Sequence, residues 1–149
     1  MKIWVDADAT PRDVKEILIK ASQRRNVNVV FVANRRLNVP VSSRIEMIAV
    51  GAGADVADDY IVVHAHVGDL VISADVPLAA RVVEAGGIVL QPRGRVLTEE
   101  NVEEALGVRN FGDSLRASGI ETGGPPPFKP ADKQRFSNAL DRFLTRHGF

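Results

Sequence analysis

Short apolar runs rich in β-branched residues alternate with helical patterns through the first ninety residues of the chain. The apolar runs predict buried strands at residues 3–5, 27–32, 45–50, 70–73 and 88–90. Between them, apolar residues recur every three or four positions, as in amphipathic helices. Strands separated by helices favour βαβ crossovers, and near-continuous apolar strands fit a sheet that is covered on both faces. The pattern therefore predicts an α/β fold, a three-layer α/β/α sandwich around a mostly parallel central sheet.

The remainder of the chain does not continue this alternation of strands and helices. Thr98 to Leu106 is typical of a helix, with Thr98 as N-cap and acidic residues in its first turn. Residues 108–130 hold four glycines and four prolines, which predicts an irregular segment. A final amphipathic helix is expected over 132–144. No repeat divides the 149 residues, so one domain spanning 1–149 is expected.

Charge and composition exclude several classes of protein. Nineteen basic residues balance nineteen acidic ones, so no global field attracts the chain to nucleic acid or to a membrane. The chain has no cysteine, which excludes disulfides and thiolate metal sites. A carboxylate already stands at position 6, and no apolar run approaches membrane-spanning length. We therefore expect a cytoplasmic protein that does not bind membranes. The sequence leaves the oligomeric state open, a homodimer included.

Aspartates follow two of the predicted strands. Asp6 and Asp8 leave the first strand, and Asp75 leaves the strand over 70–73. The carboxyl ends of parallel strands converge on one edge of a sheet, and these two strands are neighbours if the first is central. Crowded carboxylates repel unless a cation compensates, and hard oxygen ligands select Mg²⁺ or Mn²⁺. The sequence thus predicts a metal site for phosphate chemistry, the alternative being that Asp6 and Asp75 only cap the following helices.

A second acidic group lies in the short helix expected over 55–62. Asp55 and Asp59 share a face at i,i+4 spacing, whereas Asp58 is expected to point elsewhere. Either these acids contribute to the metal site, or they are a negative first turn attracted to the helix dipole. Spacing does not decide between the two.

Hydroxyl groups and arginines are candidates for holding phosphate. Thr10, before Pro11, and Ser73 lie near helix N-termini, where amides bind anions, although ordinary N-capping is favoured for Thr10 and is an equal alternative for Ser73. Arginine suits bidentate phosphate contact, and the candidates are Arg93, which directly follows the last strand, and two residues of the tail, Arg109 and Arg116. His64 and His66 would share one face of a strand, but without a third nitrogen ligand a structural role is favoured.

Motifs along nearly the whole chain resemble the YaiI/YqxD family of uncharacterised bacterial proteins. The matching residues form WVDADA with a following proline (4–9 and 11), GADVADD (53–59), GDLVISADVPLA (68–79), PRG (92–94), RNF (109–111), LR (115–116) and GGP (123–125) with Phe128. This family in turn is similar to the PIN-like nuclease group. That group has an aspartate after its first strand, an acid in a middle helix, and an aspartate after a strand that ends in Thr/Ser-x-Asp. The corresponding positions here are Asp6, Asp59 and Asp75.

The resemblance implies a PIN-like fold and Mg²⁺- or Mn²⁺-dependent hydrolysis of RNA. Catalytic roles would fall on Asp6, Asp59 and Asp75, and metal binding on these three with Asp8 and Asp55. Phosphate contacts would fall on the hydroxyl groups and arginines named above: Thr10, Ser73, Arg93, Arg109 and Arg116. Two alternatives stay open, a non-catalytic RNA-binding or protein-interaction module and a small-molecule phosphatase.

Overall fold

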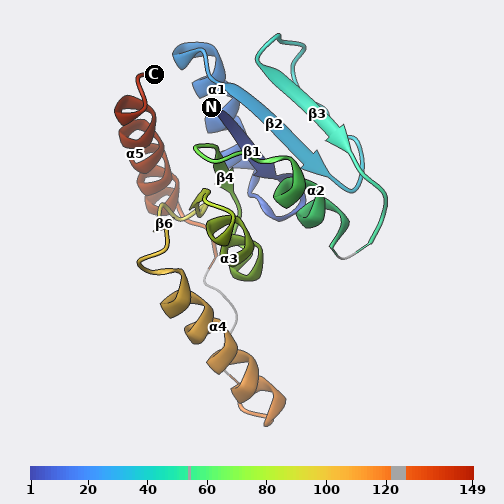
Figure 1. Cartoon of the computed structure of the whole chain (residues 1–149), viewed down its shortest axis with the longest axis vertical. Helices are drawn as coiled ribbons and strands as arrows, with labels where there is room; N and C mark the ends of the chain where they lie inside the picture. Colours follow the sequence, from blue (N-terminus) through green and yellow to red (C-terminus); the bar gives the residue numbers. More distant parts are fainter. Residues whose placement is uncertain (54, 122–126) are drawn as a thin grey trace.

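The computed structural model describes residues 1–53, 55–121 and 127–149 (Figure 1). Its elements in chain order are β1 (Lys2–Asp6), the 3₁₀ turn η1 (Ala7–Ala9), α1 (Arg12–Arg25), β2 (Asn28–Ala33), β3 (Ile45–Ala49), α2 (Val56–His64), β4 (Leu70–Ile72), α3 (Val76–Glu84), β5 (Ile88–Leu90), β6 (Val96–Leu97), α4 (Val102–Ala117) and α5 (Pro130–Arg146). No helix within these described ranges is long and apolar enough to cross a membrane.

The strands form one six-stranded sheet in the order β3-β2-β1-β4-β5-β6. Strands β1 to β5 pair in parallel, and only β6 is antiparallel to its neighbour β5. The predicted α/β class and mostly parallel sheet are confirmed, and β1 is central, between β2 and β4. Strand β6 was not predicted, because two residues are too few to show a period.

Alternate residues of the strands point to opposite faces of the sheet and enter separate cores. Val5 and Phe31 lie in a core that α1 and α5 cover. Trp4 and Val30 lie in a core on the other face, covered by α2, α3 and the first turns of α4. In Figure 1, α1 and α5 lie side by side at one end of the picture, and α4 extends away from the sheet at the other. Helices therefore pack on both faces of the sheet.

Helix α4 corrects the predicted irregular segment. The helix begins at Val102 rather than Thr98, and Asn101 precedes it, with its side-chain Oδ1 accepting a hydrogen bond of 2.9 Å from the Thr98 amide. It continues to Ala117, through residues expected to be irregular. Two interior glycines destabilise a helix by only about 1 kcal/mol each, and the prolines all come later. Part of the irregular prediction, 122–126, lies outside the described residues.

The turn between β5 and β6 is packed against the start of α5. Gly94 has φ +94°, and a Cβ added there would lie 2.8 Å from the backbone carbonyl carbon of Arg135. Its neighbour Arg93 pairs with the buried Asp132 at 2.9 Å, and Asp132 also accepts the Lys129 amide at the helix N-terminus. Helix α5 itself starts two residues before the predicted bound and ends two residues after it. We call this contact of Arg93 and Gly94 with Asp132 and Arg135 the α5 corner, and it fixes α5 against the sheet.

Gly94→Ala is expected to lower the free energy of unfolding by about 3 kcal/mol, because positive φ and a backbone clash both disfavour the methyl group. Gly119→Ala is the matched control: it has φ +84° but nothing within 4 Å of the added Cβ, so about 1 kcal/mol is expected. Urea unfolding of both variants measures the difference. Equal losses would contradict the role of the α5 corner.

Candidate functional site

Two acidic strand ends meet beside each other at the centre of the sheet. Asp6 is the last residue of β1, and Asp75 lies three residues beyond β4. Ser73 joins them: its hydroxyl donates a hydrogen bond of 2.9 Å to Asp6 Oδ2 and accepts one of 3.0 Å from the Asp75 amide. Asp6 and Ser73 are both buried. The hydroxyl of Ser73 therefore orients a carboxylate, where the sequence suggested a phosphate contact.

Helix capping accounts for Asp75 only in part and does not account for Asp6. Asp75 is the N-cap of α3, and its Oδ1 accepts a hydrogen bond of 3.1 Å from the Leu78 amide. Asp6 precedes η1 but makes no side-chain capping bond. A buried carboxylate with no capping role is the feature that sets this edge apart from an ordinary helix start.

Asp58 of α2 is the third acid near these strand ends. Burial, together with the negative charges of Asp6, Asp75 and Asp55, raises the pKa of Asp58 to about 6, although Arg81 opposes the shift. The pKa of Asp6 is also raised, by burial first and then by Asp75 and Asp8, against the lowering effect of the Ser73 hydrogen bond. The carboxylates thus repel one another across three elements, β1, α2 and the start of α3.

Asp59, the acid favoured from sequence, has a different environment. It is exposed and forms an ion pair of 2.8 Å with Arg81 of α3. The helix begins at Val56, and Asp55 before it is the N-cap, whose carbonyl oxygen accepts a hydrogen bond of 2.9 Å from the Asp59 amide. The buried positions of α2 are Ala57 and Ile61. The hydrophobic period could have identified Asp58, which lies next to this buried stripe, whereas Asp59 lies on the far side.

Asp8 ties a neighbouring loop to the same edge. It is exposed in η1, and its Oδ2 accepts a hydrogen bond of 2.7 Å from the backbone amide of Asn34, the residue after β2. Thr10 is not an N-cap, because α1 begins at Arg12 with Pro11 before it. Its buried hydroxyl instead donates to the carbonyl oxygen of Asp6 at 2.7 Å, which holds the chain as it leaves β1.

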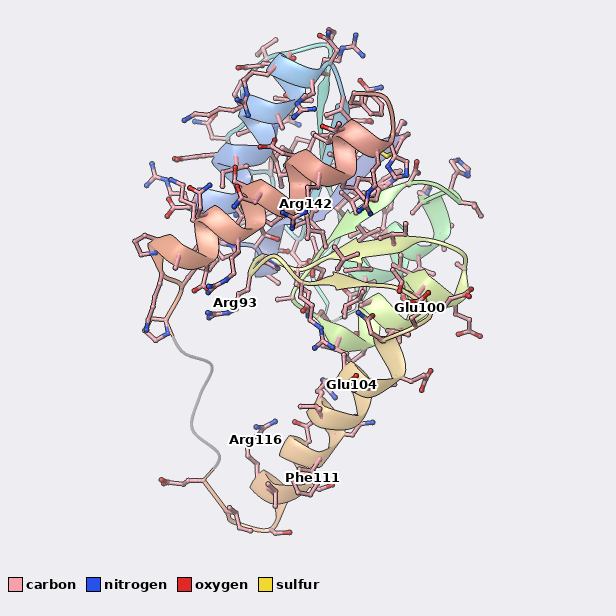
Figure 2. The ribbon with its side chains drawn as sticks, turned by 90° about the vertical axis from the view of Figure 1, so that its left-hand side faces the viewer. Arg93, Glu100, Glu104, Phe111, Arg116 and Arg142 are labelled. Carbon is pink, nitrogen blue, oxygen red and sulfur yellow. The ribbon has the colours of Figure 1, made fainter. Side chains whose placement is uncertain are left out.

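Each arginine predicted to bind phosphate forms an ion pair with an aspartate. Arg93 is part of the α5 corner, paired with Asp132 and 6.0 Å from the ring centre of Phe128. Arg109 and Arg116 both pair with Asp113 on α4. Figure 2 shows Arg116 on the part of α4 that extends away from the sheet, and Arg93 beside the start of α5. Arg109 and Arg116 therefore form ion pairs within α4, and Arg93 links the β5–β6 turn to α5.

The two histidines are not on a strand. His64 ends α2, where its ring stacks on that of Tyr60 at 3.9 Å between centroids, and its Nδ1 lies 2.8 Å from the Tyr60 carbonyl oxygen. His66 lies in the following loop, and its backbone amide donates to the buried Asp69. The expected shared strand face is therefore wrong.

Carboxylate oxygens are the donors that Mg²⁺ and Mn²⁺ prefer, so the chemistry of Asp6, Asp58 and Asp75 fits such a cation. Their spacing is looser than a closed coordination cage. Across residues 1–53, 55–121 and 127–149, no three side chains of aspartate, glutamate, histidine or cysteine stand close enough to hold a metal ion. Mg²⁺ commonly uses one or two carboxylates with waters and substrate phosphate, which this arrangement can provide.

A mostly parallel sheet with carboxylates at its central strand ends defines an α/β protein with an acidic strand-edge site. The chain belongs to the family described as "Uncharacterized BCR, YaiI/YqxD family", whose profile matches residues 4–146. It is 54% identical to a UPF0178 protein of Syntrophotalea carbinolica over 99% of both chains. It is 56% identical to UPF0178 protein DP1304 of Desulfotalea psychrophila over 98% of this chain and 99% of the relative. No solved structure matches the chain.

Asp58→Asn is expected to stabilise the fold at pH 7.5. The pKa of Asp58 is raised from 3.8 to about 6 in the folded state, so folded protein binds this proton more tightly than unfolded protein. The carboxylate therefore destabilises the fold increasingly as pH rises from 4 to 6, and fully above that. Allowing for solvent screening of this half-exposed group, we expect a gain of about 1 kcal/mol at pH 7.5 and none at pH 3.5.

Urea unfolding at the two pH values measures this gain. Asp59→Asn is the control, because it removes the same charge one residue away while breaking the exposed pair with Arg81. An equal gain from both substitutions at pH 7.5 would show that general charge reduction, and not the repulsion around Asp58, is responsible.

Proposed function

We propose that this protein is a PIN-like, metal-dependent nuclease that hydrolyses phosphodiester bonds in RNA at the edge formed by β1, β4 and α2. The observation that carries the proposal is the convergence of Asp6, Asp58 and Asp75, whose mutual repulsion a divalent cation would relieve. The resemblance to the PIN-like group supports RNA as substrate. We assign to Asp58 the catalytic role that the resemblance implied for Asp59, because the Asp59 carboxylate forms an ion pair with Arg81.

The acidic residues would have different roles, because their environments differ. Asp6 and Asp75 would hold Mg²⁺ or Mn²⁺, with Asp8 and Asp55 adding negative charge around them. When bound, the cation would lower the pKa of a water molecule and neutralise charge on the phosphate. The Ser73 hydroxyl restrains the Asp6 side chain, because it donates a hydrogen bond to the Asp6 carboxylate and accepts one from the Asp75 amide. Orientation of a ligand by such hydrogen bonds is typical of metal sites.

Asp58 is suited to accept a proton at its carboxylate from the attacking water. General bases work best with a pKa near the working pH, and burial beside other acids brings the pKa of Asp58 to about 6. Most of the Asp58 population is then deprotonated at pH 7.5 and able to take the proton. Because its pKa is about 6, the same carboxylate would be mostly protonated below pH 6, so we expect activity to fall on the acid side.

The nuclease assignment is tested with labelled single-stranded and hairpin RNA in Mn²⁺ or Mg²⁺. Wild-type protein is expected to cleave, and EDTA to stop it. Asp6→Asn and Asp58→Asn should each lower the rate at least about 100-fold, as for loss of a catalytic proton acceptor or ligand. Asp59→Asn, the neighbouring control, should stay within a few-fold of wild type.

Absence of cleavage of every RNA by the wild-type protein would overturn the nuclease proposal. A large loss with Asp59→Asn and none with Asp58→Asn would overturn the assignment of Asp58. A panel of phosphomonoesters in the same buffers detects the small-molecule phosphatase alternative.

A non-catalytic RNA-binding module is the second candidate. It is favoured by the lack of any three-ligand metal group in the part of the chain that the structure describes. It predicts RNA binding that persists in EDTA and in Asp75→Asn, with no cleavage in any metal.

A further inference from the structure

The loop after β2 places two arginines beside the acidic edge, by which we mean the strand ends that carry Asp6, Asp8 and Asp75, together with Asp58 of α2. In the parallel pairing of β1 and β2, Asp6 lies opposite Val32. Two residues further along, Asp8 is therefore level with Asn34. The 2.7 Å hydrogen bond from the Asn34 amide to Asp8 fixes this match. Arg35 and Arg36 follow directly, so the Cα of Arg36 is at most about 7.6 Å from that of Asn34. In Figure 1 the arrowheads of β1 and β2 end next to each other on this edge.

Both arginines are available to a ligand. Arg35 and Arg36 are exposed, and within the described residues neither side chain forms an ion pair or hydrogen bond. This distinguishes them from Arg93, Arg109 and Arg116, each of which pairs with an aspartate. Two successive arginines with no acidic partner thus follow a residue that is hydrogen-bonded to Asp8, and they add positive charge to this part of the surface, where it can attract a phosphate backbone.

A cavity continues from this loop along α1. It has a volume of about 330 Å³, at the lower end of the range for ligand sites. It lies between α1 and the segment after Arg36, and its lining residues are Arg12, Lys15, Glu16, Ile19, Phe31, Leu37, Asn38 and Val39. Arg12 and Lys15 add basic groups on the side opposite the loop, and Glu16 offsets Arg12 in part through a contact of 3.4 Å. The cavity therefore has an apolar floor and a largely basic rim.

We propose that Arg35 and Arg36, with Arg12 and Lys15 across the cavity, bind the phosphodiester backbone of a single-stranded RNA that leads to Asp6 and Asp58. This inference rests on the proposed nuclease function for its substrate, but it concerns binding and not the chemical step. The net charge of zero makes a local basic site necessary, because no global field attracts a polyanion. Phosphate contacts of this kind carry no sequence preference and weaken steeply with salt.

The test measures binding of a fluorescein-labelled single-stranded RNA by anisotropy, in EDTA so that cleavage is stopped, at several salt concentrations. Arg35→Ala/Arg36→Ala should weaken binding about tenfold at 0.1 M salt. It should also reduce the magnitude of the log–log salt slope by about 1.4, since each phosphate contact on a single strand contributes about 0.7. Single-stranded DNA of the same sequence should lose affinity by the same factor, because the contacts are to phosphate.

Lys20→Ala/Arg24→Ala is the matched control. It also removes two exposed positive charges, here from helix α1, which carries Arg12 and Lys15. Arg24 lies about 18 Å along this helix from Arg12. Its binding and salt slope should equal those of the wild type, and circular dichroism with thermal unfolding checks that both double variants are folded.

Equal weakening by both double variants, no weakening by either, or no binding of RNA by the wild type would each overturn the inference. Weakened RNA binding with unchanged DNA binding would overturn the phosphate assignment. Specific loss with Arg35→Ala/Arg36→Ala in a protein that cleaves no RNA would support the binding site while the nuclease proposal fails, so the two failures are distinguishable.

Discussion

The parallel pairing of β1 with β2 on one side and β4 on the other is the constraint on which the acidic edge depends. Val5 lies opposite Ile72, which brings Ser73 level with Asp6, and the register with β2 brings Asn34 level with Asp8. Both faces of β1 are apolar and buried, so a slip of one residue would exchange the two cores and is strongly disfavoured. The same burial that stabilises the sheet therefore sets the spacing of the carboxylates.

Much of the fold followed from hydrophobic period alone. All five parallel strands were expected near their observed places because each is a short apolar run, and helices were expected between strands because apolar residues recur there every three or four positions. Helix α4 was predicted to end at Leu106, because the glycines and prolines of residues 108–130 indicate an irregular segment, whereas residues that favour a helix continue it to Ala117. Strand β6 pairs only by tertiary contact with β5, which no local pattern records.

The site was predictable to the extent that it depends on strand ends. Asp6 and Asp75 follow strands whose adjacency comes from topology. The choice between Asp58 and Asp59 depends on which face of α2 meets the sheet, and the i,i+4 spacing of acids was a weaker guide than the buried Ala57 and Ile61. The arginines show the same limit, because whether a guanidinium group is free or paired, as Arg93 is with Asp132, depends on contacts between residues far apart in sequence.

Helix α5 has a consequence for the order in which the molecule assembles. The acidic edge is formed by residues between positions 6 and 75, whereas Phe136, Leu140 and Leu144, which cover one face of the sheet, come much later in the chain. A nascent chain emerging from the ribosome therefore carries all the carboxylates before it can bury that face. Until α5 has been translated, the part of this face that α5 covers is exposed apolar surface, which makes partly folded chains prone to aggregation.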